Sequence, residues 1–349
     1  MDDTPAPLSP DPASQDAHDP PPSARTAADA FGQLPPGNVL KFDYVASGGE
    51  FFWLQLVNGL FTSVTLGIYY AWARVKMLRF TIGAVRAGDD HLSFHAEGRD
   101  LFWGVLRAWA LLVVPLMIMG TIGGLLGDEN EFINYIGLVF YLVLFVFVVY
   151  SLMGSLRYRA GRTTWRGIRF KFTGTFSEFG GQYAVRILLL LVTLGIAYPF
   201  VATWRRRYII EHLQFGGEPF GFDGEAGGLM PRYLLCWFLA IPTLGLSLLW
   251  FHGHQQSYFW NQTTLVDGRF RCSMTGGGWL RIVLLSAVFV GLTFGLAAPW
   301  AYLRLHREFF SRLSLVGADL ARVRAVAASG DALGEGAADL LETDGGLDL

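Results

Sequence analysis

Six long runs that carry no charged residue constrain this chain more than any other feature of its sequence. They occupy 51–73, 108–127, 132–156, 187–204, 233–251 and 282–303. Each has about the 17–25 residues that an apolar helix needs to cross a bilayer. The 349 residues are only 16% charged, whereas a soluble domain carries about 25% charged residues. We therefore expect an integral membrane protein that crosses the bilayer several times.

Much of the chain repeats itself with a period of 50 residues, which indicates tandem structural units. A Thr-Leu-Gly triplet, or Thr-Phe-Gly in the last copy, begins at Thr65, Thr193, Thr243 and Thr293. A second motif alternates apolar and polar residues and ends in glycine, at 92–98, 170–174, 220–224 and 270–276. This alternation predicts a short strand followed by a turn. The stretch between the glycines at 98 and 174 lacks the triplet and forms a divergent unit with two apolar runs.

Aromatic and basic residues follow each triplet at fixed distances from its glycine. The offsets of five, nine and twelve residues lie on one face of a helix. Aromatic side chains suit the headgroup level of a membrane, and long basic side chains reach lipid phosphates. We therefore predict an interface that binds anionic lipids, formed by Trp72, Lys76, Arg79, Phe200, Trp204, Arg207, Trp250, Trp300, Arg304 and Arg307.

The triplets also predict breaks within the apolar runs. A glycine, followed in two units by a proline four residues later, can interrupt a helix. The hinge residues predicted on this basis are Gly67, Gly195, Pro199, Gly245, Gly295 and Pro299. Two explanations of the topology stay open. If all six apolar runs cross the membrane once, Arg205–Arg207 lie on its outer side, which conflicts with the rule that basic junctions are cytoplasmic. Either a re-entrant segment returns these arginines to the cytoplasmic side, or the rule does not hold for this cluster.

The predicted fold class is an all-α polytopic membrane protein built from repeats of about 50 residues. Each repeat has an apolar helix, a basic helical extension and a short β-like segment. Residues 1–40 contain nine of the fifteen prolines, which predicts a disordered tail. The repeat domain covers 41–316, and an acidic flexible tail covers 317–349. The predicted units are about 42–98, 98–174, 174–224, 224–276 and 276–316.

Motifs that would indicate catalysis or a resident cofactor do not appear in the sequence. Metal binding is not expected, because His252 and His254 would point about 200° apart on a helix and no ligand follows nearby. Cys236 and Cys272 lack the spacing of a disulfide framework or a zinc site. We expect no enzyme and no cofactor. The net charge is −2, whereas proteins that bind nucleic acids are typically basic, so we expect no nucleic-acid partner.

The combination of these motifs resembles the bacterial YjgN family, also called DUF898. The resemblance is carried by FFWLQLVNGLFTSVTLGIYYAWARVKMLRF at 51–80, by TLGIAYPFVATWRRRY at 193–208 and by TFGLAAPWAYLRLHREFF at 293–310. It covers about 42–315. Departures are Ala71 in place of the proline and His-Gly-His at 252–254. The resemblance implies a multi-pass protein of the bacterial inner membrane, in a family without an established molecular function.

Two classes of function stay open. The first is a transporter, channel or lipid-handling protein, which predicts a polar cavity at membrane depth near the four triplet glycines. The alternative is a structural or regulatory membrane protein that binds a partner through its β-like segments, which predicts that these segments form one exposed cytoplasmic sheet. Membrane lipids are the expected partners. A protein partner or a homo-oligomer is left open.

Overall fold

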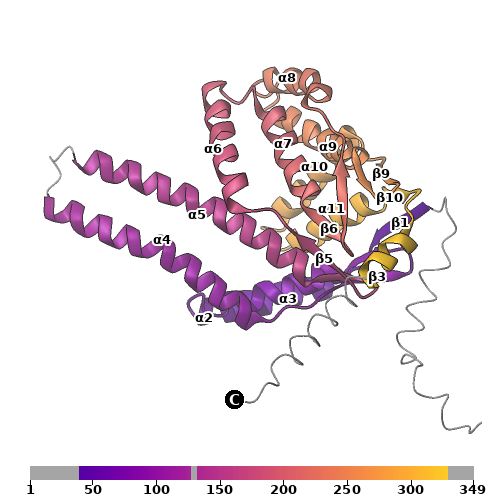
Figure 1. Ribbon diagram of the computed structural model, residues 1–349, viewed down its shortest axis with the longest axis horizontal. Coiled ribbons are helices and arrows are strands. Elements are labelled where there is room, and N and C mark those ends of the chain that lie inside the picture. Colours follow the sequence, from indigo (N-terminus) through magenta and orange to yellow (C-terminus); the bar gives the residue numbers. More distant parts are fainter. Residues whose placement is uncertain (1–38, 127–131, 329–349) are drawn as a thin grey trace, which may run out of the picture.

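Ten short strands form a closed antiparallel barrel in the computed structural model, which describes residues 39–126 and 132–328 (Figure 1). Neighbouring strands follow the order β1-β10-β9-β8-β7-β6-β5-β4-β3-β2. The strands are β1 (Val39–Tyr44), β2 (Val85–Ala87), β3 (Asp90–Phe94), β4 (Thr163–Trp165), β5 (Ile168–Phe172), β6 (Leu213–Phe215), β7 (Glu218–Phe222), β8 (Thr263–Leu265), β9 (Gly268–Cys272) and β10 (Leu313–Val316).

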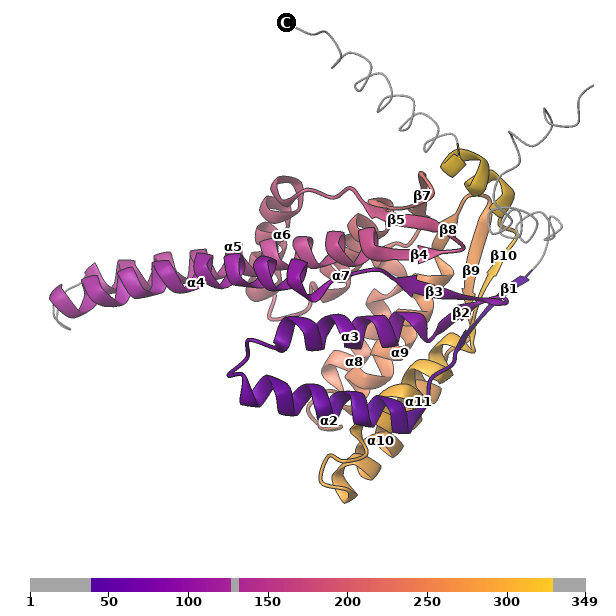
Figure 2. The ribbon, with the colours of Figure 1, turned by 90° about the horizontal axis from the view of Figure 1, so that it is seen from below.

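Helices connect the strand hairpins in pairs and extend away from the barrel (Figure 2). The pairs are α2 (Gly48–Val64) with α3 (Tyr70–Gly83), α4 (Gly98–Leu126) with α5 (Phe132–Arg162), α6 (Phe176–Val192) with α7 (Tyr198–Glu211), α8 (Met230–Phe238) with α9 (Leu246–Asn261), and α10 (Gly276–Leu292) with α11 (Ala298–Phe310). A short 3-10 helix, η2 (Ala226–Gly228), precedes α8. The second helix of each pair packs on the beginning of the next pair, and α11 packs on α2. Five helix pairs therefore form a ring above five strand hairpins.

The fifth strand hairpin is made from the two ends of the repeat region. β1 pairs with β10, with Leu40 opposite Leu315, and also with β2. This pairing gives every strand two neighbours, so the barrel has no free edge that could pair with another chain. The helix at 320–328 then follows β10, and its Leu320 and Val323 are buried in the main hydrophobic cluster.

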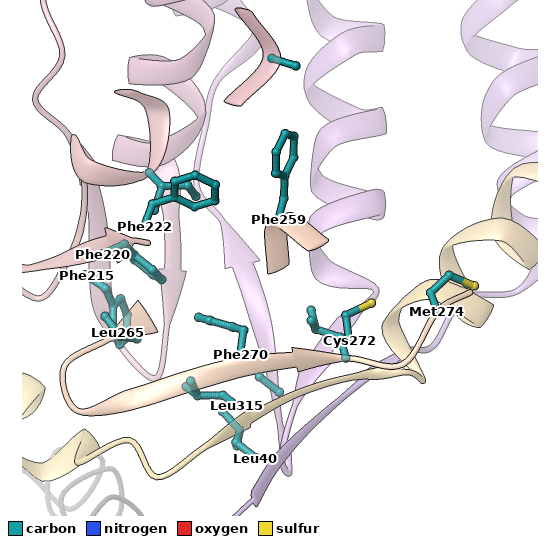
Figure 3. Close-up of a cluster of buried hydrophobic side chains, with 14 of the residues drawn as sticks. Leu40, Phe215, Phe220, Phe222, Phe259, Leu265, Phe270, Cys272, Met274 and Leu315 are labelled. Atoms are coloured by element: carbon teal, nitrogen blue, oxygen red, sulfur yellow. The ribbon is translucent and has the colours of Figure 1, made fainter. Parts of the chain in front are cut away.

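Alternation along the strands explains why the barrel has an apolar interior. Successive side chains of a strand point to opposite faces, and in β9 the buried Phe270 lies between the exposed Arg269 and Arg271. Figure 3 shows side chains from several strands gathered inside the barrel, among them Leu40, Phe215, Phe220, Leu265, Phe270 and Leu315. The glycine-terminated motifs of the sequence are these strands, so the prediction of short strands is confirmed.

The predicted all-α fold class is wrong, because the fold is mixed and the strands assemble into a single barrel. The prediction of six crossing segments is also not supported. Only two helices of the described residues are long and apolar enough to cross a membrane, at Gly98–Ile122 and Gly137–Arg162. The four apolar runs with triplets each fold back as a helix-turn-helix hairpin. Most of the predicted tails, at 1–38 and 329–349, lies outside the described residues.

Candidate functional site

Each Thr-Leu-Gly triplet forms the turn of a helical hairpin, and the three residues have separate roles. In the first unit the Thr65 hydroxyl donates to the carbonyl of Phe61 at 2.7 Å and accepts from the amide of Tyr69 at 3.0 Å. Leu66 and Gly67 adopt left-handed backbone conformations, with φ of 49° and 91°. The Gly67 amide donates to the Thr62 carbonyl at 2.8 Å, which is the long-range bond of a Schellman motif. One triplet thus ends α2 and begins α3.

The turn satisfies its own backbone donors in all four units. In the third unit the amides from Thr193 to Tyr198 all donate within the hairpin, with the Thr193 hydroxyl accepting from Ala197 at 3.1 Å. The same bonds occur in the fourth and fifth units. In hydrocarbon no water can replace a missing partner, so backbone groups must be satisfied internally. The turn therefore meets the requirement for a bend inside a bilayer.

The side chain at the tip of each turn is apolar and points away from the protein. The exposed fraction is 94% for Leu66, 79% for Leu194, 93% for Leu244 and 98% for Phe294. A left-handed conformation costs a residue with a side chain roughly 1–2 kcal/mol. Four repeated apolar side chains in such a position indicate an environment that favours apolar contact at the tips.

The structure places the predicted hinge residues at these turns rather than inside continuous helices. Gly67, Gly195, Gly245 and Gly295 have φ between 84° and 91°. An added Cβ at Gly67, Gly245 or Gly295 would meet no other atom within 4 Å, so these glycines lie in open space. Pro199 and Pro299 stand in the first turn of α7 and α11, where the missing proline amide is not needed.

The basic residue at offset twelve binds the protein itself. The Nη2 atoms of Arg79 and Arg207 donate at 2.9 Å to the carbonyls of Ala96 and Gly224. Arg307 makes the corresponding bond to Ala46 at 3.0 Å. Each carbonyl follows a strand that leads into the next helix pair. In the fourth unit Ser257 takes the position and donates to Cys272 at 2.8 Å. We call these bonds the arginine clamps.

The alignment of the triplet units with one another did not reveal the arginine clamp of the divergent unit. Arg157 of α5 donates to the carbonyl of Gly174 at 3.0 Å, again 17 residues ahead. The unit has no triplet on which it could be aligned. The signal that could have found it is the Arg-Tyr pair, at Arg157-Tyr158 and at Arg207-Tyr208, with a glycine 17 residues after the arginine.

The aromatic residue at offset five joins one unit to the next. The Trp72 ring lies against Gly98, the first residue of α4, and the Trp300 ring lies against Gly48, the first residue of α2. Trp250 packs in the same way on Gly276. A Cβ at these glycines would overlap the tryptophan. Phe200 differs: it is 50% exposed and precedes the unit that begins with η2.

The residues at offset nine lie on the outer parts of the hairpins. Lys76 donates to the Tyr69 hydroxyl at 2.8 Å. The Trp204 indole donates to Gln182 at 3.1 Å, and Arg186 lies 4.0 Å above its ring. Arg304 is exposed on α11. Binding of lipid by any of these predicted interface residues stays a prediction.

A pocket of about 380 Å³ lies between α3, α4 and α5. Arg74 of α3 and Arg159 of α5 line it together with Asp100, Leu101, Val105, Tyr150 and Ser151. The pocket is at the barrel end of the long α4–α5 pair, because its residues come from the start of α4 and the end of α5. Neither arginine belonged to the predicted site.

The pocket carries positive charge that no acidic side chain among the described residues neutralises. Asp100 binds Arg162 at 2.6 Å, whereas neither Arg74 nor Arg159 forms an ion pair with any acidic side chain of the described chain. Arg159 only reaches back to Ser155, with Nε donating to its carbonyl at 3.2 Å. The Tyr158 hydroxyl and Ser151 Oγ are buried there without a hydrogen-bond partner among the described residues. The arrangement offers several donors to one anion.

Comparison with known proteins assigns the family. The family model described as "Bacterial protein of unknown function (DUF898)" matches residues 39–250 and 236–340. The chain belongs to the DUF898 family. The matches cover the barrel and all helix pairs of this DUF898 chain, so the recognised resemblance is confirmed. No solved structure matches it.

Curated relatives of this DUF898 chain are named "Inner membrane protein YjgN". The protein from Salmonella typhimurium is 26% identical over 156 residues, 44% of this chain and 37% of the relative. The protein from Escherichia coli O157:H7 is 21% identical over 246 residues, 70% of this chain and 55% of the relative. The chain thus spans between about a third and just over half of the length of these relatives.

Proposed function

We propose that the chain is a lipid-binding protein of the bacterial inner membrane that holds the anionic headgroup of a phospholipid in the Arg74–Arg159 pocket. The single observation that carries the proposal is the pair of unneutralised guanidinium groups at the base of α4–α5. The names of the YjgN relatives support an inner-membrane location.

The hairpins support a specific placement in the membrane. α4 and α5 have 29 and 31 residues, or about 45 Å at 1.5 Å per residue, and are long enough to cross. α2, α6 and α10 have 17 residues each, about 25 Å, and turn back. Only the long pair crosses in this placement, and the short hairpins dip into the bilayer from the barrel side.

This placement removes the conflict over the arginine cluster. Because α6 and α7 form a hairpin, Arg205–Arg207 stand at the barrel end, as do Arg79, Arg157 and Arg307. All basic junctions then face one side, and basic loops mark the cytoplasm. The far ends of α4 and α5, at Leu126 and Phe132, would lie on the periplasmic side, and the barrel would be cytoplasmic.

The depth of the pocket suits a phospholipid headgroup. The pocket lies at the barrel end of α4 and α5, and the end of a helix that crosses the bilayer lies at the membrane–water interface, where the lipid phosphate groups are found. Leu101, Val105 and Tyr150 form an apolar wall along the helices, which can contact the upper acyl chain. Guanidinium groups bind phosphate through charge-assisted hydrogen bonds.

A lipid-exchange experiment tests the proposal. Full-length protein, purified in a mild detergent, is titrated with phosphatidylglycerol or phosphatidylcholine, and bound lipid is counted by native mass spectrometry. We expect the wild type to prefer phosphatidylglycerol by about tenfold or more, since each charge-assisted hydrogen bond contributes about 1.5–3 kcal/mol. The Arg74→Ala/Arg159→Ala double variant should lose this preference.

A matched control removes two charges elsewhere. Arg269 and Arg271 are exposed on the outer face of β9, so Arg269→Ala/Arg271→Ala should leave the preference unchanged. An equal loss in both double variants would mean that only net charge matters and would refute the pocket.

The other hypotheses find less support. The triplet glycines lie at exposed tips, not beside a polar cavity at membrane depth, so the path expected of a transporter has no counterpart there. The strands do come together, as the partner-binding hypothesis expected, but the closed barrel offers no edge for strand addition. A partner would have to bind its outer face.

A further inference from the structure

The barrel encloses an apolar chamber of about 230 Å³. All ten strands contribute lining residues, and a layer of Phe42, Leu92, Phe170, Phe220 and Phe270 occupies equivalent positions of the five hairpins. Among the described residues that line the chamber, only Thr263 has a hydroxyl, and this hydroxyl donates to the Phe259 carbonyl at 2.8 Å. Protein interiors have few voids larger than a water molecule. An apolar chamber of this size stays dry and accepts hydrocarbon.

Side chains from outside the strands line both ends of the chamber. At one end the helix at 320–328 lies over the β6–β7 turn, with Val323 against Gly216 and Arg322 paired with Glu218 at 3.2 Å. The positive φ of Gly216 and Gly217, 59° and 89°, permits this close approach. At the other end Ile210, Trp260 and Phe310 from the ends of α7, α9 and α11 form the floor.

A partly buried cation lies against this floor. The guanidinium of Arg206 stacks on the Trp260 ring, 4.8 Å from its centroid. Its Nε and Nη2 atoms are inaccessible to solvent and have no hydrogen-bond partner among the described residues. Burial, followed by the charge of neighbouring Arg205, lowers the pKa of Arg206 to about 10, so the group is still charged at neutral pH. Buried donors of a charged group that lack a partner are costly, and an anion beside Trp260 would relieve that cost.

We propose that the barrel binds a single-chain carboxylic acid of medium length, with its alkyl chain in the chamber and its carboxylate on Arg206. An apolar cavity of 150 Å³ accepts the six carbons of benzene, so by proportion a 230 Å³ chamber accepts roughly nine carbons. The site is separate from the Arg74–Arg159 pocket, since the two share no lining residue.

Equilibrium dialysis of radiolabelled decanoate tests this inference on full-length protein in peptidiscs, where detergent cannot occupy the chamber. We expect saturable binding of one decanoate per chain. Ala87 points into the chamber from β2 and is 2% exposed, so Ala87→Phe should fill the space and weaken both decanoate and decanol by at least tenfold. Arg206→Leu should weaken decanoate by at least tenfold and leave decanol unchanged.

Controls separate occupancy of the chamber from loss of folding and from the headgroup pocket. Thermal unfolding is measured for every variant, and Leu315→Phe replaces Ala87→Phe if the latter does not fold. Arg74→Ala/Arg159→Ala should keep wild-type decanoate binding, so the two sites can fail independently. Wild-type binding by a folded chamber-filling variant would overturn the inference. An equal loss of decanoate and decanol in Arg206→Leu would overturn the role of the arginine.

Discussion

The divergent α4–α5 unit and the four triplet units share one framework but differ in how far they reach. The divergent unit ends in an arginine clamp at Arg157, as do three of the four triplet units at Arg79, Arg207 and Arg307, and Ser257 takes the position in the other one. Both lead into a two-strand hairpin of the barrel. The helices, however, have 29 and 31 residues in one case and at most 17 in the others. The barrel framework therefore tolerates hairpins of different length, and length decides which of them can cross a membrane.

The largest expected effect concerns the long unit alone. Leu142 lies between the first residue of α5, Phe132, and the pocket residue Tyr150, in the middle of the part of α5 that would cross, and is 62% exposed. A charge at the centre of a crossing helix costs about 2.5–3.5 kcal/mol in insertion. Leu142→Arg should therefore reduce the membrane-inserted fraction strongly, measured by extraction with alkaline carbonate, while Leu142→Met should not. Normal insertion of Leu142→Arg would mean that α5 does not cross.

The clamps test whether the framework is truly shared. A hydrogen bond from a charged donor to a part-buried carbonyl contributes about 1.5–3 kcal/mol to the free energy of unfolding, and removal of the arginine loses that contribution. Arg157→Ala and Arg207→Ala should therefore lower the free energy of unfolding by similar amounts, measured by denaturant titration in detergent. Arg304→Ala, on the exposed face of α11, is the control and should change little. A large loss in only one clamp variant would show that the two kinds of unit are built differently.

The triplet hydroxyl gives the smallest effect and concerns the short units. Thr193→Val removes the acceptor of the Ala197 amide, and hydrogen bonds in membrane proteins contribute about 1 kcal/mol. We expect Thr193→Val to lower the free energy of unfolding by this amount and Thr193→Ser to leave it unchanged. Both are measured by denaturant titration in detergent. Equal stability of the valine and serine variants would remove the argument for a self-satisfied turn.

The repeat units could be predicted from the sequence, but the closure of their strands into a barrel could not. The period of 50 and the alternating motifs correctly located the strands that end in Phe172, Phe222 and Cys272. The barrel could not be predicted, because its strands have three to six residues and its last hairpin joins β1 to β10 across almost the whole chain. The sequence predicted breaks at the triplets and left a re-entrant segment open, but it could not decide between a crossing and a hairpin, because an apolar run looks the same whether it continues or turns. The left-handed backbone conformation of Leu66 cannot be predicted from the composition of the apolar run.

The sequence aligned equivalent positions of the repeats, whereas the contacts of those side chains and the Arg74–Arg159 pocket required the fold. The offsets that aligned Trp72 and Arg79 reflected real equivalence, but the two side chains bind Gly98 and Ala96 of the next unit. Arg74, Arg159 and Arg206 escaped notice, because their significance depends on which neighbours lack an opposite charge, and that requires the fold.

Cysteine-accessibility mapping shows directly whether α4 and α5 alone cross the membrane. Single cysteines are placed at the exposed Asp89 and Asp267 in barrel turns, at Asn130 between α4 and α5, and at Leu194 at a hairpin tip, with Cys236 and Cys272 replaced by serine. We predict that a membrane-impermeant maleimide added to intact cells labels only position 130. In inverted vesicles it should label positions 89 and 267, and position 194 should stay unlabelled in both. Labelling of position 194 from the periplasm, or of 89 and 267 from opposite sides, would contradict a single crossing pair.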